Sequence, residues 1–254
     1  MHPIAILTYH SLDTSGSVVS VTPNVFAAQM ACVAGLGYRG LALRDAVTHR
    51  EAHGSWPEKS VVLTFDDGYR NFFEQGLPVL VRHDFSATLF LASGHVGGEN
   101  GWADPPPRLG TLPLLSWDQA MDLSAAGVEI GSHSKSHPDL RQLAPLEIEG
   151  EIVGSRTEIA DRIGRPVVSF AYPFGRVGNA ARQVVRREFR AACTGVLKRA
   201  ADEPLHELPR VDMFYLRSSA SLKKLLNGQL DRHLTVLRWG RTIRQLLRNT
   251  DRKP

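Results

Sequence analysis

Two pairs of side chains of metal-binding type stand out in this sequence. Asp66 and Asp67 are adjacent at the end of an apolar run and precede a glycine, while His133 and His137 lie four residues apart. Two carboxylates held close together raise each other's pKa, which costs free energy unless they share a cation or a proton. Two imidazoles and one carboxylate form a typical ligand set for Zn²⁺ that leaves a coordination position open for water. The pattern therefore predicts a catalytic metal site.

Each half of this pattern is a weak signal when it is taken alone. An Asp-Asp-Gly turn after a strand more often serves the backbone geometry than catalysis. Histidines at positions i and i+4 are more often surface or core residues than metal ligands. The two halves support each other only if the fold brings the ends of their strands together.

Apolar runs of strand length alternate with helix-like segments along the chain, which is typical of a parallel α/β fold. Thr22 is expected to cap a helix that has Pro23 at its first position, and Ser116 is expected to begin another. We expect seven strands, at 4–9, 38–43, 61–65, 86–93, 128–134, 167–175 and 191–196.

Seven strands with helical connections fit a closed or nearly closed β/α barrel better than a doubly wound open sheet. The residues after the first strand, "TYHSLD", contain no glycine-rich phosphate-binding pattern. In β/α barrels the chemistry lies on the loops after the carboxyl ends of the strands. His10, both aspartates, both histidines and residues 172–175 all lie at or just beyond the carboxyl ends of predicted strands, so we expect them at one end of the barrel. The segment 94–114, rich in glycine and proline, is expected to form a rim or substrate wall there.

Three motifs in this order resemble those of one enzyme family. They are "TFDDGY" at 64–69, "HSKSH" at 133–137 and "FAYPFG" at 170–175. They are similar to the motifs of the polysaccharide deacetylases of carbohydrate esterase family 4, the NodB-homology enzymes. The opening "ILTYHSL" and the later "LPRVDMF" resemble the exopolysaccharide-modifying branch in particular. The resemblance implies a distorted (β/α)7 barrel, similar to a TIM barrel.

The resemblance also implies roles for the four residues with which we began. Asp66 would be the general base, and Asp67, His133 and His137 would hold the metal. The ion would be Zn²⁺, although ligand sets of this kind also accept Co²⁺, Ni²⁺ or Mn²⁺. The implied reaction is hydrolysis of N-acetyl groups on hexosamine-containing glycans or glycoconjugates, with an N-acetylated saccharide as the substrate partner.

The third motif resembles the family only in part. The matching position for a backbone N–H that stabilises the oxyanion is Phe174, with Pro173 and Tyr172 beside it as substrate-binding candidates. Many family members have an arginine at the position of Ala171, where it orients the base. Arg210 in "LPRVDMF" could supply that guanidinium instead, although a surface arginine is an equally good interpretation.

The histidine that serves as general acid in the family has no clear match in this chain. His10, His206 and His233 are the candidates. We favour His10 as the catalytic residue because it follows a strand on the catalytic face, whereas His233 lies in a basic tail. A packing or capping role for His10 remains an alternative.

The net charge of +4 is concentrated at the end of the chain, since residues 218–254 carry nine basic and two acidic side chains. We expect a barrel over 1–217 and a basic helical extension over 218–254 that packs on or beside it. The apolar residues of the extension at helical spacing include Leu234, Ile243 and Leu247. An interfacial helix that contacts anionic lipid is the alternative interpretation. Nucleic-acid binding is not expected, because the basic stretch has no recognisable reading motif.

The start "MHPIAILTYHSLD" lacks the features of a secretory signal, and no apolar stretch has the length of a membrane span. We therefore expect a cytoplasmic protein, which the extension could bring to the inner membrane. The main hypothesis is a metal-dependent N-deacetylase. The alternatives are a glycan-binding protein that has lost turnover and another C–N hydrolase of the allantoinase type on the same barrel.

Overall fold

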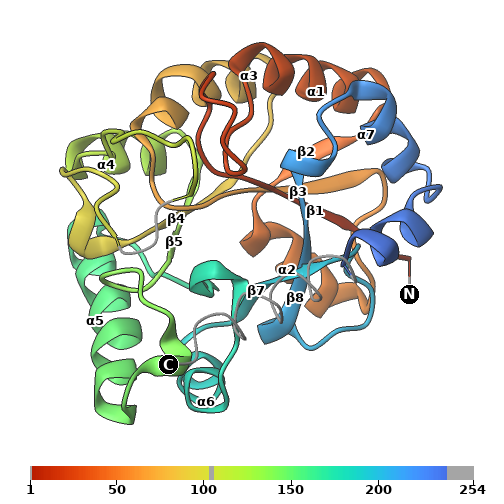
Figure 1. Cartoon of the computed structure of the whole chain (residues 1–254). Helices are drawn as coiled ribbons and strands as arrows, with labels where there is room; N and C mark the ends of the chain where they lie inside the picture. Colours follow the sequence, from red (N-terminus) through yellow and green to blue (C-terminus); the bar gives the residue numbers. More distant parts are fainter. Residues whose placement is uncertain (1, 103–105, 239–254) are drawn as a thin grey trace, which may run out of the picture.

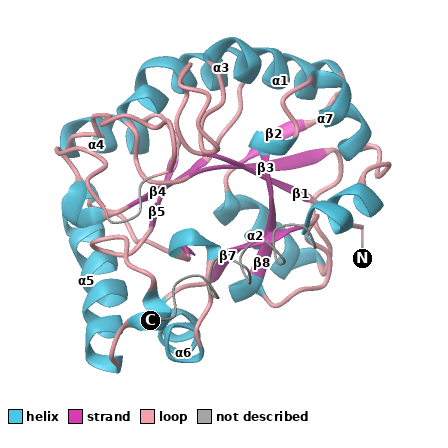
Figure 2. Cartoon of the chain, in the orientation of Figure 1, coloured by secondary structure: helices cyan, strands magenta, loops and turns pink. Residues whose placement is uncertain are grey.

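The computed structural model describes residues 2–102 and 106–238. Strands occupy the centre of the molecule and helices surround them (Figures 1 and 2). The strands are β1 Ala5–Tyr9, β2 Arg39–Leu41, β3 Ser60–Phe65, β4 Thr88–Leu91, β5 Glu129–Ser132, β6 Ser169–Ala171, β7 Ala191–Leu197 and β8 Leu208–Asp212. The helices are α1 Pro23–Gly35, α2 Leu43–His53, α3 Leu77–Arg82, α4 Trp117–Ala125, α5 Pro145–Ile163, α6 Asn179–Glu188 and α7 Ser219–Leu226.

The strands close into a parallel ring, so the barrel prediction is confirmed. β1 pairs with both β3 and β8, and the order β3-β4-β5-β6-β7-β8 completes the circle. β2 pairs only with the first half of β3, next to the point where β4 begins its own pairing. The seven strands of the ring therefore include β8, which the sequence analysis did not count as a strand, instead of β2.

Strand alternation explains why a carboxylate follows the apolar run of β3. Val61, Leu63 and Phe65 face outward into the main hydrophobic core between the sheet and the helices. Val62 faces into the barrel, and so does Thr64, whose hydroxyl lies 3.2 Å from that of Thr8 on β1. Because side chains alternate along a strand, the next inward position is residue 66.

The amino-terminal end of the barrel is closed by α2. The first turn of this helix is fixed to the interior, because Leu43 N–H donates to Thr88 Oγ1 at 2.7 Å and Arg44 N–H donates to the buried Glu129 carboxylate at 2.9 Å. Its apolar face, with Trp56 after it, packs against the inward side chains of several strands. The opposite end, where the strands have their carboxyl ends, holds polar residues instead.

The predicted helix starts are confirmed at the two positions that were argued from capping. The Thr22 hydroxyl accepts from Val25 N–H at 3.3 Å, with Pro23 as the first residue of α1. Ser116 caps α4 and forms a capping box with Gln119. These caps fix where the helices begin relative to the strand ends before them.

The described part of the carboxyl-terminal extension packs on the barrel. Residues 231–238 are helical, Leu234 is buried in the main core, and Arg199 forms two hydrogen bonds with the Asp231 carboxylate at 2.9 and 2.6 Å. Ile243 and Leu247, which the lipid-contact interpretation needs, lie outside the described residues. Lipid contact and the boundary at residue 217 therefore stay predictions. Within the described ranges, we find no helix with the length and apolar character needed to traverse a membrane.

Candidate active site

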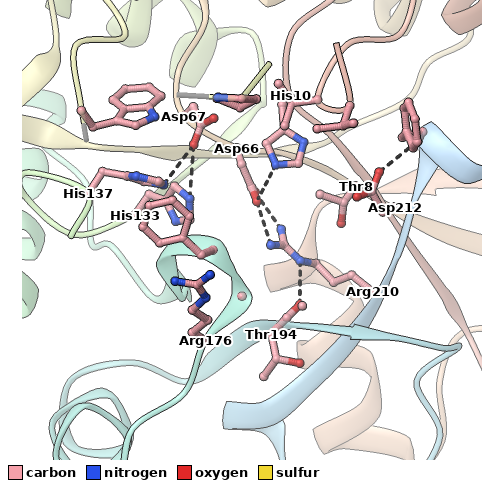
Figure 3. Close-up of a pocket in the computed structure, with 18 of the residues that line it drawn as sticks. Thr8, His10, Asp66, Asp67, His133, His137, Arg176, Thr194, Arg210 and Asp212 are labelled. Atoms are coloured by element: carbon pink, nitrogen blue, oxygen red, sulfur yellow. Dashed lines mark hydrogen bonds and ion pairs between the residues drawn. The ribbon is translucent and has the colours of Figure 1, made fainter. Parts of the chain in front are cut away.

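Asp66 and Asp67 both reach the cavity at the carboxyl end of the barrel, although they are neighbours in sequence (Figure 3). Asp66 continues the inward positions of β3. Asp67 has a φ of 75°, and the left-handed conformation turns its carboxylate to the same side. Such a conformation costs a non-glycine residue about 1–3 kcal/mol and is typical of functional sites. Both side chains are almost fully buried, with 2% and 7% of their surface exposed.

Three donor atoms converge at Asp67. Its Oδ1 lies 3.4 Å from His133 Nε2 and 3.4 Å from His137 Nε2, and the three donor atoms lie within 4.8 Å of one another. His133 Nδ1 lies 2.7 Å from Ala171 O and donates to it, so Nε2 is the ring nitrogen that faces Asp67. His137 Nδ1 has no hydrogen-bond partner among the described residues. The donor types and their convergence fit a divalent cation.

Metal binding needs an ionised Asp67 and neutral imidazoles. The surroundings favour these protonation states at Asp67 and His137 but not at His133. Burial raises the pKa of Asp67, but the hydrogen bond from His133 and the charge of His137 hold that pKa well below its usual range. Burial lowers the pKa of His137 to about 4, so its imidazole is neutral. Burial lowers the pKa of His133 as well, but the two aspartates raise it overall. A cation at Asp67 would take the place of the proton that these carboxylates favour on His133.

Asp66 forms a bidentate ion pair with Arg210 of β8. The two guanidinium nitrogens Nη1 and Nη2 donate to Asp66 Oδ1 and Oδ2, each at 2.7 Å, and Arg210 Nε donates to Thr194 O at 3.2 Å. Burial raises the pKa of Asp66, but the charges of Arg210, His133 and His10 and the hydrogen bonds from Arg210 together outweigh burial, so the pKa lies below its ordinary value. The arginine that the sequence analysis left open as a surface residue is therefore buried against the carboxylate.

The three histidines considered as general acid differ clearly in position. His10 lines the cavity, with Nε2 at 3.8 Å from Asp66 Oδ2 and its side chain 19% exposed. His206 Nε2 lies 2.8 Å from Phe189 O, outside the cavity lining. His233 is exposed on the 231–238 helix. Of the three, only His10 is placed to contact a substrate.

The turn of the third motif contributes Phe174 to the cavity wall, whereas Tyr172 and Pro173 do not reach the cavity. Phe174 lines the cavity with φ 56°, and its ring centroid lies 4.7 Å from that of His137. Tyr172 is fully buried, packs against Phe170 with a centroid distance of 5.2 Å, and does not line the cavity. Pro173 is buried and is also absent from the lining. The inward pleat of β6 ends at Ala171, so Tyr172 falls on the outer, core side. A substrate-binding role for Tyr172 and Pro173 therefore stays a prediction that the cavity lining does not support.

Gly175 holds the Phe174 turn against β7, and its replacement by alanine is expected to disturb catalysis selectively. A Cβ on residue 175 would lie 2.3 Å from the Cα of Gly195, and Gly175 has a φ of 65°. The turn must therefore shift and carry the Phe174 N–H with it. We expect kcat to fall by about 10²–10³, as for the loss of one oxyanion donor. The measurement is steady-state turnover, with metal content as a second readout.

The matched control for Gly175→Ala is Gly154→Ala on α5, where a Cβ would meet nothing within 4 Å. That variant is expected to keep the wild-type kcat. A Gly175→Ala protein with undiminished kcat would contradict a role for the Phe174 turn in the reaction.

The cavity has a volume of about 340 Å³, and its wall includes apolar and basic residues besides the polar ones described above. The rim residues Trp102, Pro106 and Pro107 come from the segment 94–114, as expected of a substrate wall. Isolated apolar and basic side chains carry no distinctive spacing in the sequence, so the other large side chains of the wall had no assigned role. These are Val18, Val19, Arg176, Phe214 and Tyr215.

A closed parallel β/α barrel with an Asp-His-His donor set beside an arginine-paired carboxylate has the arrangement of a metal-assisted hydrolase. The sequence comparison identifies the family. The family profile described as "Polysaccharide deacetylase" matches residues 53–188, which is more than half of the chain, and the protein belongs to that family.

Individual relatives agree with the family match. YxkH of Bacillus subtilis (strain 168) is 27% identical over 173 residues, covering 68% of this chain and 57% of YxkH. The poly-beta-1,6-N-acetyl-D-glucosamine N-deacetylase of Staphylococcus aureus (strain MSSA476) is 23% identical over 177 residues, covering 66% of this chain and 58% of that enzyme. The chain thus spans less than two thirds of the length of these two relatives.

Solved structures share the fold. The Streptococcus pyogenes deacetylase PplD, in complex with acetate, matches with a TM-score of 0.78 at 24% identity, covering 89% of this chain and 98% of PplD. IcaB from Ammonifex degensii matches with a TM-score of 0.71 at 21% identity, covering 88% of this chain and 98% of IcaB. The barrel fold is therefore shared with both solved structures, and PplD is a deacetylase.

Proposed function

We propose that this protein is a metal-dependent N-deacetylase that hydrolyses N-acetyl groups of a hexosamine-containing glycan or glycoconjugate and releases acetate and a free amine. The observation that carries the proposal is that two adjacent aspartates have different partners. Asp67 faces two imidazole nitrogens, while Asp66 is buried against Arg210 and lies outside that donor set. The family match and the named substrate of the Staphylococcus aureus relative support the same reaction.

Asp67, His133 and His137 are the residues that would hold the cation. Zn²⁺ is the proposed ion, and Co²⁺, Ni²⁺ or Mn²⁺ suit the same nitrogen and oxygen donors. Such a cation would make water more acidic and would polarise the amide carbonyl. Three protein ligands leave room for the substrate and water to approach.

Asp66 accepts the proton that the attacking water loses. Arg210 holds both carboxylate oxygens in place and keeps the group ionised, so that the base is ready at neutral pH. The water oxygen forms a bond to the carbonyl carbon, and the Phe174 N–H would stabilise the negative charge on the former carbonyl oxygen. His10 then donates a proton to the amine nitrogen as the C–N bond breaks.

His10→Gln is expected to lower kcat by about 10²–10⁴, the usual contribution of a positioned acid. Metal content should remain at the wild-type level, because His10 is not among the convergent donors. His206→Gln is the matched control, since His206 bonds to Phe189 O outside the cavity, and it should keep the wild-type kcat. Equal kcat values for the two variants would remove His10 from the mechanism.

The experiment that tests the proposed function is acetate release from a panel of N-acetylated saccharides after metal has been restored. The proposal predicts acetate from oligomers of N-acetylglucosamine or from a related hexosamine glycan. A glycan-binding protein without turnover would bind the panel and release no acetate. An allantoinase-like hydrolase would act only on a non-sugar amide, and either result would contradict the proposal.

A further inference from the structure

The turn that carries His133 and His137 is strained. Ser134 has a φ of 65° and His137 a φ of 56°, and both values lie in the left-handed region that favours glycine. Each such residue costs about 1–3 kcal/mol and persists only where the surrounding structure determines it from several sides. The short turn between the two proposed ligands therefore needs support from outside the motif.

Glu151, in the second turn of α5, provides that support from one side. Its Oε2 accepts hydrogen bonds from Lys135 N–H at 2.9 Å and from Ser136 N–H at 2.8 Å. Its Oε1 accepts a third hydrogen bond from the Ser136 hydroxyl at 2.6 Å. Hydrogen bonds to an ionised acceptor are about twice as strong as those between neutral groups. One carboxylate thus holds two consecutive residues of the turn.

The segment after β4 holds the turn from the opposite side. Ser93 N–H donates to Ser134 O at 3.2 Å, and Gly94 N–H donates to Lys135 O at 2.8 Å. The Ser93 hydroxyl in turn donates to Glu158 on α5 at 2.7 Å. Inside the turn, His137 N–H donates to Ser134 Oγ at 3.1 Å. Four of the six backbone N–H and C=O groups of residues 134–136 are therefore bonded to α5 or to the segment after β4, and Glu158 ties that segment to α5 as well.

We propose that Glu151 is a positioning residue for the metal site, although it does not line the cavity. The inference rests on the proposed function in one respect, namely that His133 and His137 are metal ligands. Without the Glu151 carboxylate, two adjacent N–H groups lose their acceptor and the strained turn relaxes. Metal binding must then order the turn again before His137 faces Asp67, and this ordering costs free energy. Glu151 thus contributes to metal affinity by keeping the ligands in place before the ion arrives.

The test measures the dissociation constant for Zn²⁺ alone, by competition of the metal-stripped full chain with a chelator. Glu151→Gln keeps the size of the side chain but removes its negative charge, so the hydrogen bonds to the turn become bonds between neutral groups, which are about half as strong. We expect its dissociation constant for Zn²⁺ to rise about 10-fold, at the lower end for residues that orient metal ligands. Ser136→Ala removes only one of the three hydrogen bonds and should give a smaller rise.

Glu149→Gln is the matched control on the same helix. Its carboxylate pairs with Arg187 at 2.6 and 3.0 Å on the outer surface and does not touch the turn. This variant should bind Zn²⁺ as the wild type does. The melting temperature of each metal-free protein separates positioning from general stability, because a purely structural role would lower it and leave Zn²⁺ affinity unchanged.

The outcomes separate this inference from the proposed function. If the wild type binds Zn²⁺ and both Glu151→Gln and Ser136→Ala bind it equally well, the positioning role is wrong while the metal site stands. If the wild type binds no divalent cation, the proposed function fails, and the inference fails with it. Should Glu151→Gln not fold, Ser136→Ala decides the result, since the exposed Ser136 can lose its hydroxyl without disturbing the core.

Discussion

Asp66→Asn is expected to lower kcat by about 10²–10⁴ and to leave the metal bound. The asparagine oxygen can still accept a hydrogen bond from Arg210, so the side chain keeps its place, but the amide cannot take a proton from water. The three convergent donors are untouched by the change. Acetate release and metal content, measured on the same preparation, check both halves of this expectation.

The control for Asp66→Asn is His133→Ala, which should lose both metal and turnover because it removes one of the three donors. Circular dichroism of the two variants confirms that each remains folded. If Asp66→Asn loses the metal while Asp67→Asn retains it, the roles assigned to the two aspartates are exchanged.

Arg210→Met is expected to lower the free energy of unfolding by about 3–5 kcal/mol, the usual cost of breaking a buried ion pair from one side. Asp66 is then left without its two hydrogen bonds at 2.7 Å in a site with almost no exposure to water. Equilibrium unfolding in urea at neutral pH measures the loss. The double variant Asp66→Asn with Arg210→Met should recover part of it, because neither charge remains. A single Arg210→Met variant as stable as the wild type would contradict the buried pair.

The same substitution should move the acidic limb of kcat/KM to higher pH. Arg210 lowers the pKa of Asp66, so the carboxylate without its partner is protonated more easily. The free energy of unfolding depends on pH in the same direction, because it also falls as Asp66 is protonated. The pair stabilises the fold above the pKa of Asp66 in the unfolded chain, and this contribution is lost as the pH falls through the lower folded-state pKa. The stability difference between the wild type and Arg210→Met should therefore narrow in acid.

The residues that we propose to bind metal or to act as the base were predictable as a group because they carry a local signal. Asp66 and Asp67 interrupt an apolar strand, and His133 and His137 have a recognisable spacing. Parallel strands bring their carboxyl ends to one face, so the order of the motifs was enough to place them together. The structure brings all four to one cavity.

The residues that support the site carry no such signal. β8 reads as a loop because Pro209 and Arg210 interrupt its apolar pattern, yet Arg210 faces inward to meet Asp66. Glu151 is one of several glutamates on α5, and only the packing of that helix beside the histidine turn distinguishes it. Contacts between residues so far apart along the chain depend on the assembled barrel, which a single sequence does not display.

We propose that deacetylation depends on one divalent cation held by Asp67, His133 and His137. The decisive experiment measures the rate of acetate release by the metal-stripped protein as Zn²⁺ is added in known amounts. We expect no turnover without metal and a rate that rises in proportion to bound Zn²⁺ up to one ion per chain. A stripped protein that releases acetate at the full rate, or a rate that does not respond to any divalent cation, would contradict it.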